Sequence, residues 1–228
     1  MDHNPDLLAL GGLDRLQEIS GGLILYLNND MLELDGLRGL TTVRGDLRVT
    51  ENESLQGVSE LAALAELGGD LAIDYCTALT SLEGLDSLTG FGGDLVLRGN
   101  NPLVNLDGLD ELTEIGGALN IERQGELSSL AALSGLYSLG GGLILNEVGS
   151  LETLTGLEAL TALGDTLALT RNPLLADVGA LHGLSGIDGD VLVQGNLALD
   201  PADAEALIDA IGEDNITGEI ILSGNGGE

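Results

Sequence analysis

Carboxylates recur at one fixed spacing along this chain and are the first residues that could do chemistry. Asp46, Asp70 and Asp94 follow one another at intervals of 24 residues, and Asp190 lies later on the same spacing. If each interval is one structural layer, these side chains stack about 5 Å apart and repel one another. A Ca²⁺ ion, which prefers oxygen ligands, would relieve that repulsion. The alternative is a row of solvated carboxylates at a turn, and the row is interrupted at Ala118, Gly142 and Thr166.

Catalytic side chains are scarce. There are two histidines, His3 in the N-terminal tail and His182 after the apolar Leu181, and one cysteine, Cys76, in a position that we expect to face inward. A structural role is therefore favoured for Cys76 over a nucleophilic one. Polysaccharide lyases built on β-helices form their clefts from long loops, which units of constant length do not allow. We expect no enzymatic activity and no cofactor, apart from the calcium considered above.

The elements that must position these residues come from a 24-residue repeat. Eight units without insertion or deletion fill residues 7–198. They begin at Leu7, Met31, Leu55, Leu79, Leu103, Leu127, Leu151 and Leu175. Units of equal length that share apolar positions are expected to stack in register.

Within each unit, numbered from its first residue, the apolar positions predict short strands and bends. Positions 17 and 19 are apolar, as in Leu95 and Leu97, and this period of two is typical of a strand with one face in the core. Positions 1, 4, 7, 10 and 13 are also apolar. Their spacing of three could suggest a helix, but Gly at position 6 of five units opposes that.

Two further features predict how the bends are built. Positions 14 and 15 are usually Gly-Gly, as at Gly68-Gly69, and we expect them to supply the positive φ of a sharp corner. Position 22 is expected to point inward and to form a hydrogen-bonded ladder between coils. The predicted ladder residues are Asn28, Asn52, Cys76, Asn100, Asn172 and Asn196, with Gln124 and Val148 in the remaining two units.

The ends of the chain depart from the repeat. Residues 1–6 form an N-terminal tail, and we expect the N-terminal edge of the stack to be exposed. Residues 199–228 form a C-terminal cap. Asp200 is a typical N-cap followed by Pro201, which predicts a helix over about 201–212 that covers the last coil. A strand over about 219–223 repeats the strand-and-Asn pattern.

The repeated string of apolar, Gly and Asn positions, as in Leu40-Thr-Thr-Val43-Arg-Gly45-Asp-Leu47-Arg-Val49-Thr-Glu-Asn52, resembles the receptor L domain family. The element Leu95-Val-Leu97-Arg-Gly-Asn100 is also similar to leucine-rich repeats. The resemblance implies an all-β fold, a right-handed parallel β-solenoid of about eight 24-residue coils, and a binding or surface role. Receptor L domains usually carry flanking disulfides and exposed aromatic side chains. This chain departs from them in both respects, so no ligand site is transferred.

The outward positions 18 and 20 of the strands form the predicted interaction surface. Exposed aliphatic side chains on a sheet face favour partner binding when they gather in a patch, whereas isolated ones are ordinary. The residues singled out are Ile24, Tyr26, Arg48, Val96, Arg98, Ile144 and Leu192.

Charge limits the partners. With 38 acidic and 7 basic residues the net charge is −31, which disfavours nucleic acid and anionic lipid and favours solubility, cations or a basic protein surface. The alternative account is a high-salt or otherwise demanding habitat, or a GC-rich genome that replaces Lys with Arg, since all seven basic residues are Arg. The sequence contains no apolar run of about 18 residues, so we expect no membrane insertion. The resemblance implies an extracellular or cell-surface location with a leader outside this sequence, whereas a complete chain would be cytoplasmic.

These observations favour a non-enzymatic recognition or adhesion module that binds a protein or glycan partner through a solenoid face. The alternatives are a structural protein that self-associates, either end to end through its coil edges or face to face, and an idealised solenoid without a native ligand.

Overall fold

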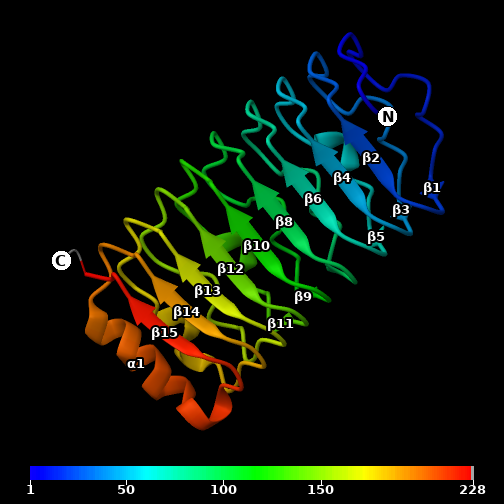
Figure 1. The fold of residues 1–228 in the computed structure, drawn as a ribbon. Helices are drawn as coiled ribbons and strands as arrows, with labels where there is room; N and C mark the ends of the chain where they lie inside the picture. Colours follow the sequence, from blue (N-terminus) through cyan, green and yellow to red (C-terminus); the bar gives the residue numbers. More distant parts are fainter. Residues whose placement is uncertain (227–228) are drawn as a thin grey trace.

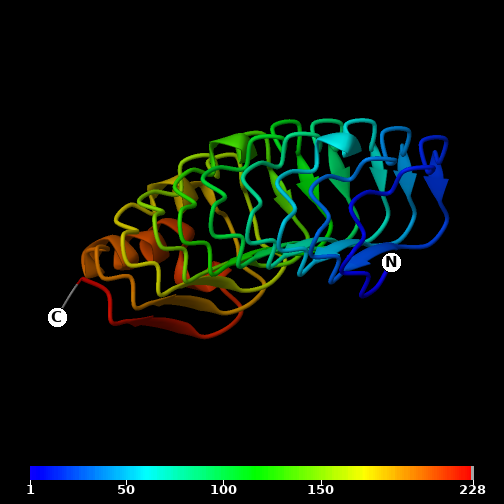
Figure 2. The ribbon, with the colours of Figure 1, turned by 90° about the horizontal axis from the view of Figure 1, so that it is seen from above.

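The computed structural model describes residues 1–226 and is a parallel β-solenoid with a single α-helix at its C-terminal end (Figure 1). The last two residues of the predicted cap, 227–228, lie outside the described residues. Nine strands, one from each unit and one from the cap, form a large parallel sheet along one side (Figure 2). These strands are β2 (Leu23–Tyr26), β4 (Leu47–Thr50), β6 (Leu71–Asp74), β8 (Leu95–Arg98), β10 (Leu119–Glu122), β12 (Leu143–Asn146), β13 (Leu167–Thr170), β14 (Val191–Gln194) and β15 (Ile220–Ser223).

Six shorter strands form two small parallel sheets on the part of each coil that precedes the large sheet. The order is β1-β3-β5 in one and β11-β9-β7 in the other. Their bounds are β1 (Glu18–Ile19), β3 (Thr42–Val43), β5 (Glu66–Leu67), β7 (Gly90–Phe91), β9 (Glu114–Ile115) and β11 (Ser138–Leu139). Within residues 1–226, no helix combines the length and the apolar character needed to cross a membrane.

The strand register confirms the stacking predicted from the repeat. Leu71 pairs with Leu95, and Leu95 pairs with Leu119, so that equal unit positions lie side by side. Positions 17 and 19, such as Leu47 and Val49, are buried, while positions 18 and 20 face outward. The prediction of inward and outward columns in the large sheet is therefore confirmed.

The apolar positions spaced by three lie on successive turns rather than on a helix. In unit four, Leu82, Leu85 and Leu88 are fully buried. The Leu85 N–H donates to the Leu82 carbonyl at 3.2 Å, and the Leu88 N–H donates to the Leu85 carbonyl at 3.0 Å. Each turn satisfies the backbone of one buried leucine and returns the chain inward for the next.

Position 6 selects between two conformations of this segment. Where it is Gly, as at Gly84 and Gly108, φ is +108° and +107°, a region that disfavours side chains with a Cβ. The other units have Glu60, Ala132 or Ala180 there, and each lies in a 3₁₀ helix. These helices are η1 (Ser59–Leu61), η2 (Ala131–Leu133) and η3 (Gly179–Gly183).

The prediction that the Gly-Gly pairs supply positive φ was wrong, because none of these pairs has a positive φ. Glycine is needed there for close approach between coils. A Cβ on Gly116 would lie 2.5 Å from the Gly92 carbonyl oxygen, and one on Gly92 would lie 3.0 Å from the Gly68 carbonyl oxygen. The left-handed residue after each strand is instead at position 21, with φ between 52° and 70° in all eight units. It is non-glycine in six of them: Leu27, Glu51, Tyr75, Arg123, Glu147 and Arg171.

The two ends of the solenoid are closed differently. At the C-terminal end, α1 (Pro201–Ile211) buries Leu207, Ile208 and Ile211 and is followed by η4 (Glu213–Asn215) and β15. The Asp200 side chain accepts the Ala202 N–H at 2.9 Å, as expected of an N-cap. At the N-terminal end, residues 1–3 pair with β2.

The expectation of an exposed N-terminal edge is therefore corrected for the large sheet. Asp2 forms a parallel bridge with Tyr26. The Tyr26 N–H donates to the Met1 carbonyl at 3.0 Å, and the His3 N–H donates to the Tyr26 carbonyl at 2.9 Å. The tail satisfies edge groups of β2 that would otherwise face water. β1 remains the edge strand of its small sheet.

Candidate functional site: the outer face of the large sheet

The outer face of the large sheet presents two columns of side chains, from positions 18 and 20 of the units. The column at position 18 continues into β15, and its two end residues are the most open: Ile24 is 51% exposed and Ile221 is 37% exposed. Val96, Ile144 and Leu192 also point outward but are half-buried by their neighbours. In the C-terminal half of the face, position 18 is a continuous aliphatic column, because Ile144, Ala168, Leu192 and Ile221 are successive register partners. In the N-terminal half, Arg48 and Asn120 interrupt the column.

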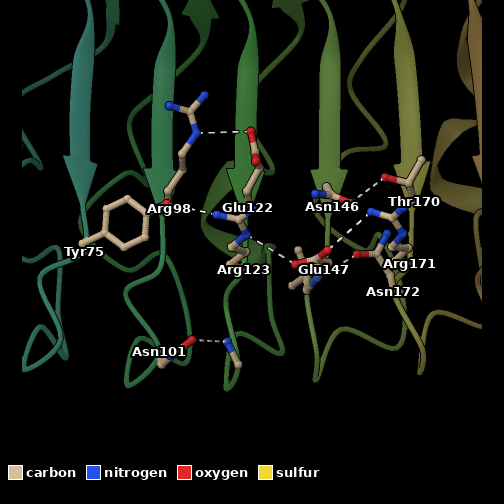
Figure 3. Close-up of polar contacts among 12 residues, drawn as sticks. Tyr75, Arg98, Asn101, Glu122, Arg123, Asn146, Glu147, Thr170, Arg171 and Asn172 are labelled. Atoms are coloured by element: carbon tan, nitrogen blue, oxygen red, sulfur yellow. Dashed lines mark hydrogen bonds and ion pairs between the residues drawn. The ribbon is translucent and has the colours of Figure 1, made fainter.

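Arginines join neighbouring strands at the N-terminal part of this face. The Arg48 Nη2 atom lies 3.0 Å from Asp46 Oδ2 and 2.7 Å from Asp70 Oδ2. Further along the sheet, between β8 and β10, the Arg98 Nε atom lies 3.2 Å from Glu122 Oε1 (Figure 3). The pairs are more than a third exposed on the arginine side, so they order the surface more than they stabilise the fold.

Beyond the strand ends, the left-handed position 21 extends the charged surface. Figure 3 shows Glu147 between two arginines, with Arg123 Nε 3.4 Å and Arg171 Nη1 3.5 Å from its carboxylate oxygens. The Tyr75 hydroxyl accepts a hydrogen bond from Arg123 Nη1 at 3.2 Å, two coils away. The coil between them has Gly99 at this position, where a Cβ would lie 2.6 Å from the tyrosine ring.

The Asp46, Asp70 and Asp94 column is built into the backbone between coils. The Oδ1 atom of Asp46 accepts the Asp70 N–H at 3.1 Å, and that of Asp70 accepts the Asp94 N–H at 3.0 Å. Asp94 accepts the Ala118 N–H at 2.7 Å. The backbone N–H of Asp70, together with Arg48, lowers the pKa of Asp46. These contacts give the three carboxylates protein partners, and calcium binding by the column stays a prediction.

A different group of carboxylates has the spacing of metal ligands among the described residues. Oxygen atoms of Glu33, Asp35 and Glu60 all lie within 4.8 Å of one another. Glu60 is buried, and its Oε2 accepts the Leu34 N–H at 3.2 Å while its Oε1 accepts the Ser59 hydroxyl at 3.0 Å. A neighbouring arginine, Arg38, lies 2.9 Å from Asp35. Sequence reasoning missed this group, although Glu60 stands where most units have glycine.

The inward column at position 22 forms a ladder. In each intact step the side-chain Oδ1 of one asparagine accepts the backbone N–H of the preceding coil, and its Nδ2 donates to a carbonyl of that coil. Asn100 does both, accepting from Cys76 N at 2.9 Å and donating to Ile73 O at 2.7 Å. The predicted ladder residues Asn28, Asn52, Cys76, Asn100, Asn172 and Asn196 are all fully buried, and β15 is followed by Asn225, which extends the ladder to Asn196.

Two groups on these columns are held away from solvent. Burial raises the pKa of the Cys76 thiol to about 11. On the outer face, burial raises the pKa of Asp74 against the opposing charge of Arg98, and the Asp74 Oδ1 atom is buried without a hydrogen bond. The raised thiol pKa agrees with a structural role for Cys76. His3 and His182 are both exposed; His3 lies in the N-terminal residues that pair with β2, and His182 lies in η3 of the eighth unit.

No protein-family model matches this chain, and no curated protein sequence does. The resemblance to the receptor L domain family therefore rests on the residue pattern of the units, and the structure shows a parallel β-solenoid of the repeat type.

Proposed function

We propose that this chain is a non-enzymatic recognition module that binds a protein or glycan partner through the outer face of the large sheet. One observation carries the proposal. The inward positions are nearly the same in every unit, whereas the outward positions 18 and 20 change from coil to coil between aliphatic, basic, acidic and amide side chains. Repeat scaffolds bind through such extended faces, in which each unit contributes different side chains.

The solenoid and the repeated Leu and Asn pattern also support a role like that of receptor L domains. The acidic surface favours a basic partner. End-to-end assembly through the core is less favoured, since α1 covers the apolar core at one end and residues 1–3 pair with the edge of the large sheet at the other.

The outer face is tested with labelled protein on printed glycan and peptide arrays. The variant Ile144→Glu places a charge at the centre of the face, and Val104→Glu serves as the matched control because Val104 is exposed outside the large sheet. We expect the array spots that bind the unaltered chain to lose binding with Ile144→Glu and to keep it with Val104→Glu. Both variants are checked for folding by urea unfolding. Binding that both variants keep, or the absence of any spot that binds the unaltered chain, contradicts the proposal.

A further inference from the structure

The two edges of the large sheet differ. At the β2 edge, the chain's own residues 1–3 add backbone hydrogen bonds. At the other edge, within residues 1–226, β15 pairs with β14 and is the last strand of the sheet. An unpaired edge strand is a template for a further strand.

The register identifies which groups of β15 are open. The Val191 N–H donates to the Glu219 carbonyl at 2.8 Å, and the Gly195 N–H donates to the Ser223 carbonyl at 2.9 Å. In a parallel pair, alternate residues bond to the same neighbour. The N–H and C=O groups of Ile220 and Leu222 therefore point away from β14, toward the open edge.

A groove runs along this edge beside α1. In Figure 2, α1 lies over the end of the core whereas β15 runs along the sheet side. Two adjoining hollows of about 270 Å³ each lie between them and share Glu205 and Leu222. One continues toward Pro201 and Ser223, and the other toward Ile208, Asp209, Glu213 and Ile220.

The groove has an apolar floor and an acidic rim. Ile220 and Leu222 are half-buried against the core. Glu205, Asp209 and Glu213 are exposed on the rim, and within residues 1–226 their side chains make no ion pair or hydrogen bond.

The charge of this region selects the occupant. Residues 199–226 contain seven acidic residues and no basic one. Asp209 and Glu213 also lie at the C-terminal end of α1, where the helix dipole disfavours negative charge. A basic segment would reduce both the repulsion among these acidic side chains and their unfavourable interaction with the helix dipole.

We propose that β15 and its groove bind an extended segment of a partner protein that carries basic residues at alternate positions, added as a further strand of the large sheet. The strand's backbone pairs with Ile220 and Leu222. Its inward Lys or Arg stems cover the apolar floor while their charged ends reach Glu205, Asp209 and Glu213. A second copy of this chain does not supply the segment, because it has no lysine and no two arginines two residues apart.

The probe is a short fluorescein-labelled peptide in which lysine and valine alternate, titrated with the full chain at low salt and followed by anisotropy. A peptide of the same composition with lysines and valines in separate blocks tests the alternation. An N-methylated version, which cannot donate backbone hydrogen bonds, tests strand addition. The protein variant Glu205→Gln/Asp209→Asn/Glu213→Gln removes the rim charges. Its control, Glu111→Gln/Glu126→Gln/Glu152→Gln, makes the same change in net charge at exposed side chains elsewhere.

We expect the alternating peptide to bind the unaltered chain and the control variant equally, and the rim variant roughly tenfold more weakly, as three exposed ion pairs would give. The block and N-methylated peptides should bind the unaltered chain at least as weakly as the alternating peptide binds the rim variant. Equal binding of the alternating and N-methylated peptides would reduce the interaction to charge attraction and overturn the proposal. So would equal loss in both protein variants, or the absence of binding to the unaltered chain.

Discussion

The ladder of position-22 side chains is the most ordered polar feature of the interior, and its weakest point is at Gln124 and Val148. Gln124 is fully buried, and both its Oε1 and Nε2 atoms are without hydrogen bonds. Its side chain is one methylene longer than asparagine and does not reproduce the ladder geometry. Val148 offers no acceptor to the Gln124 N–H. The asparagine at the next coil, Asn172, resumes the ladder by accepting the Val148 N–H at 2.9 Å.

The double variant Gln124→Asn/Val148→Asn should therefore complete the ladder and stabilise the protein. Two buried unsatisfied atoms disappear and new hydrogen bonds form at about 1 kcal/mol each, while the lost burial of one valine offsets part of the gain. We expect the free energy of unfolding to rise by about 1–2 kcal/mol, measured as a higher urea midpoint with unchanged slope. Gln56→Asn, at an exposed position, is the control and should change nothing. A lower midpoint for the double variant would contradict the ladder account.

Cys76 allows a pH test of the same column. The thiol's pKa is raised from 9.0 to about 11 by burial. The unfolded chain therefore releases this proton at lower pH than the folded protein. Stability should fall as pH rises from about 9 to 11, since the folded state then binds more protons than the unfolded state. Urea unfolding across that range should show a steeper loss for the unaltered chain than for Cys76→Ala. Parallel curves for the two proteins would argue against a buried thiol.

At the scale of elements, position 6 decides how each coil turns before its strand. Gly84 has φ +108°, and a Cβ on it would lie 2.5 Å from the Val58 carbonyl oxygen of the coil before. Ala132 occupies the same position two units later and lies in η2. The glycine form and the 3₁₀ form thus place the same buried leucines with different backbones.

Gly84→Ala should be strongly destabilising, by at least about 2 kcal/mol, because it combines a disfavoured φ with a backbone clash. Ala132→Gly should cost about 1 kcal/mol, mostly through the entropy of the unfolded chain. Thermal and urea unfolding of the two variants measure the difference. Equal losses would mean that the conformations at position 6 are not tied to the residue that occupies it.

The elements also show what could be predicted from sequence. The period of two at positions 17 and 19 and the constant unit length predict the strands of the large sheet and their register, and the recurrence of Asn at position 22 predicts the asparagine column. The outward residues of the face, such as Ile144, followed from the same alternation. The left-handed residue at position 21 was not predictable by type, because Glu51, Tyr75 and Arg123 are not residues that favour positive φ. The Glu60 cluster and the groove at β15 depend on which coils become neighbours and on where α1 packs, and neither shows in one unit.

For the whole molecule, each coil contacts chiefly its two neighbours, so stability should be close to a sum over coils and the interfaces between them. From β2 to β14, each strand residue pairs with the residue 24 positions later in the next coil. Removing one complete unit therefore brings together two coils whose columns still match. Which unit is removed then decides how much ladder is lost.

Deletion of residues 127–150 removes Val148 and places Gln124 directly before Asn172, whose Oδ1 atom can then accept the Gln124 N–H. Deletion of residues 151–174 has the same length but removes Asn172, and with it a fully bonded step to Asn196 and Leu145. Both proteins should fold, with urea slopes reduced in proportion to the surface lost. The deletion of 127–150 should leave the higher free energy of unfolding, by about 1 kcal/mol or more, because it removes the defective step rather than an intact one. If the deletion of 151–174 proved the more stable, the ladder would contribute less to the stacking of coils than the apolar columns beside it.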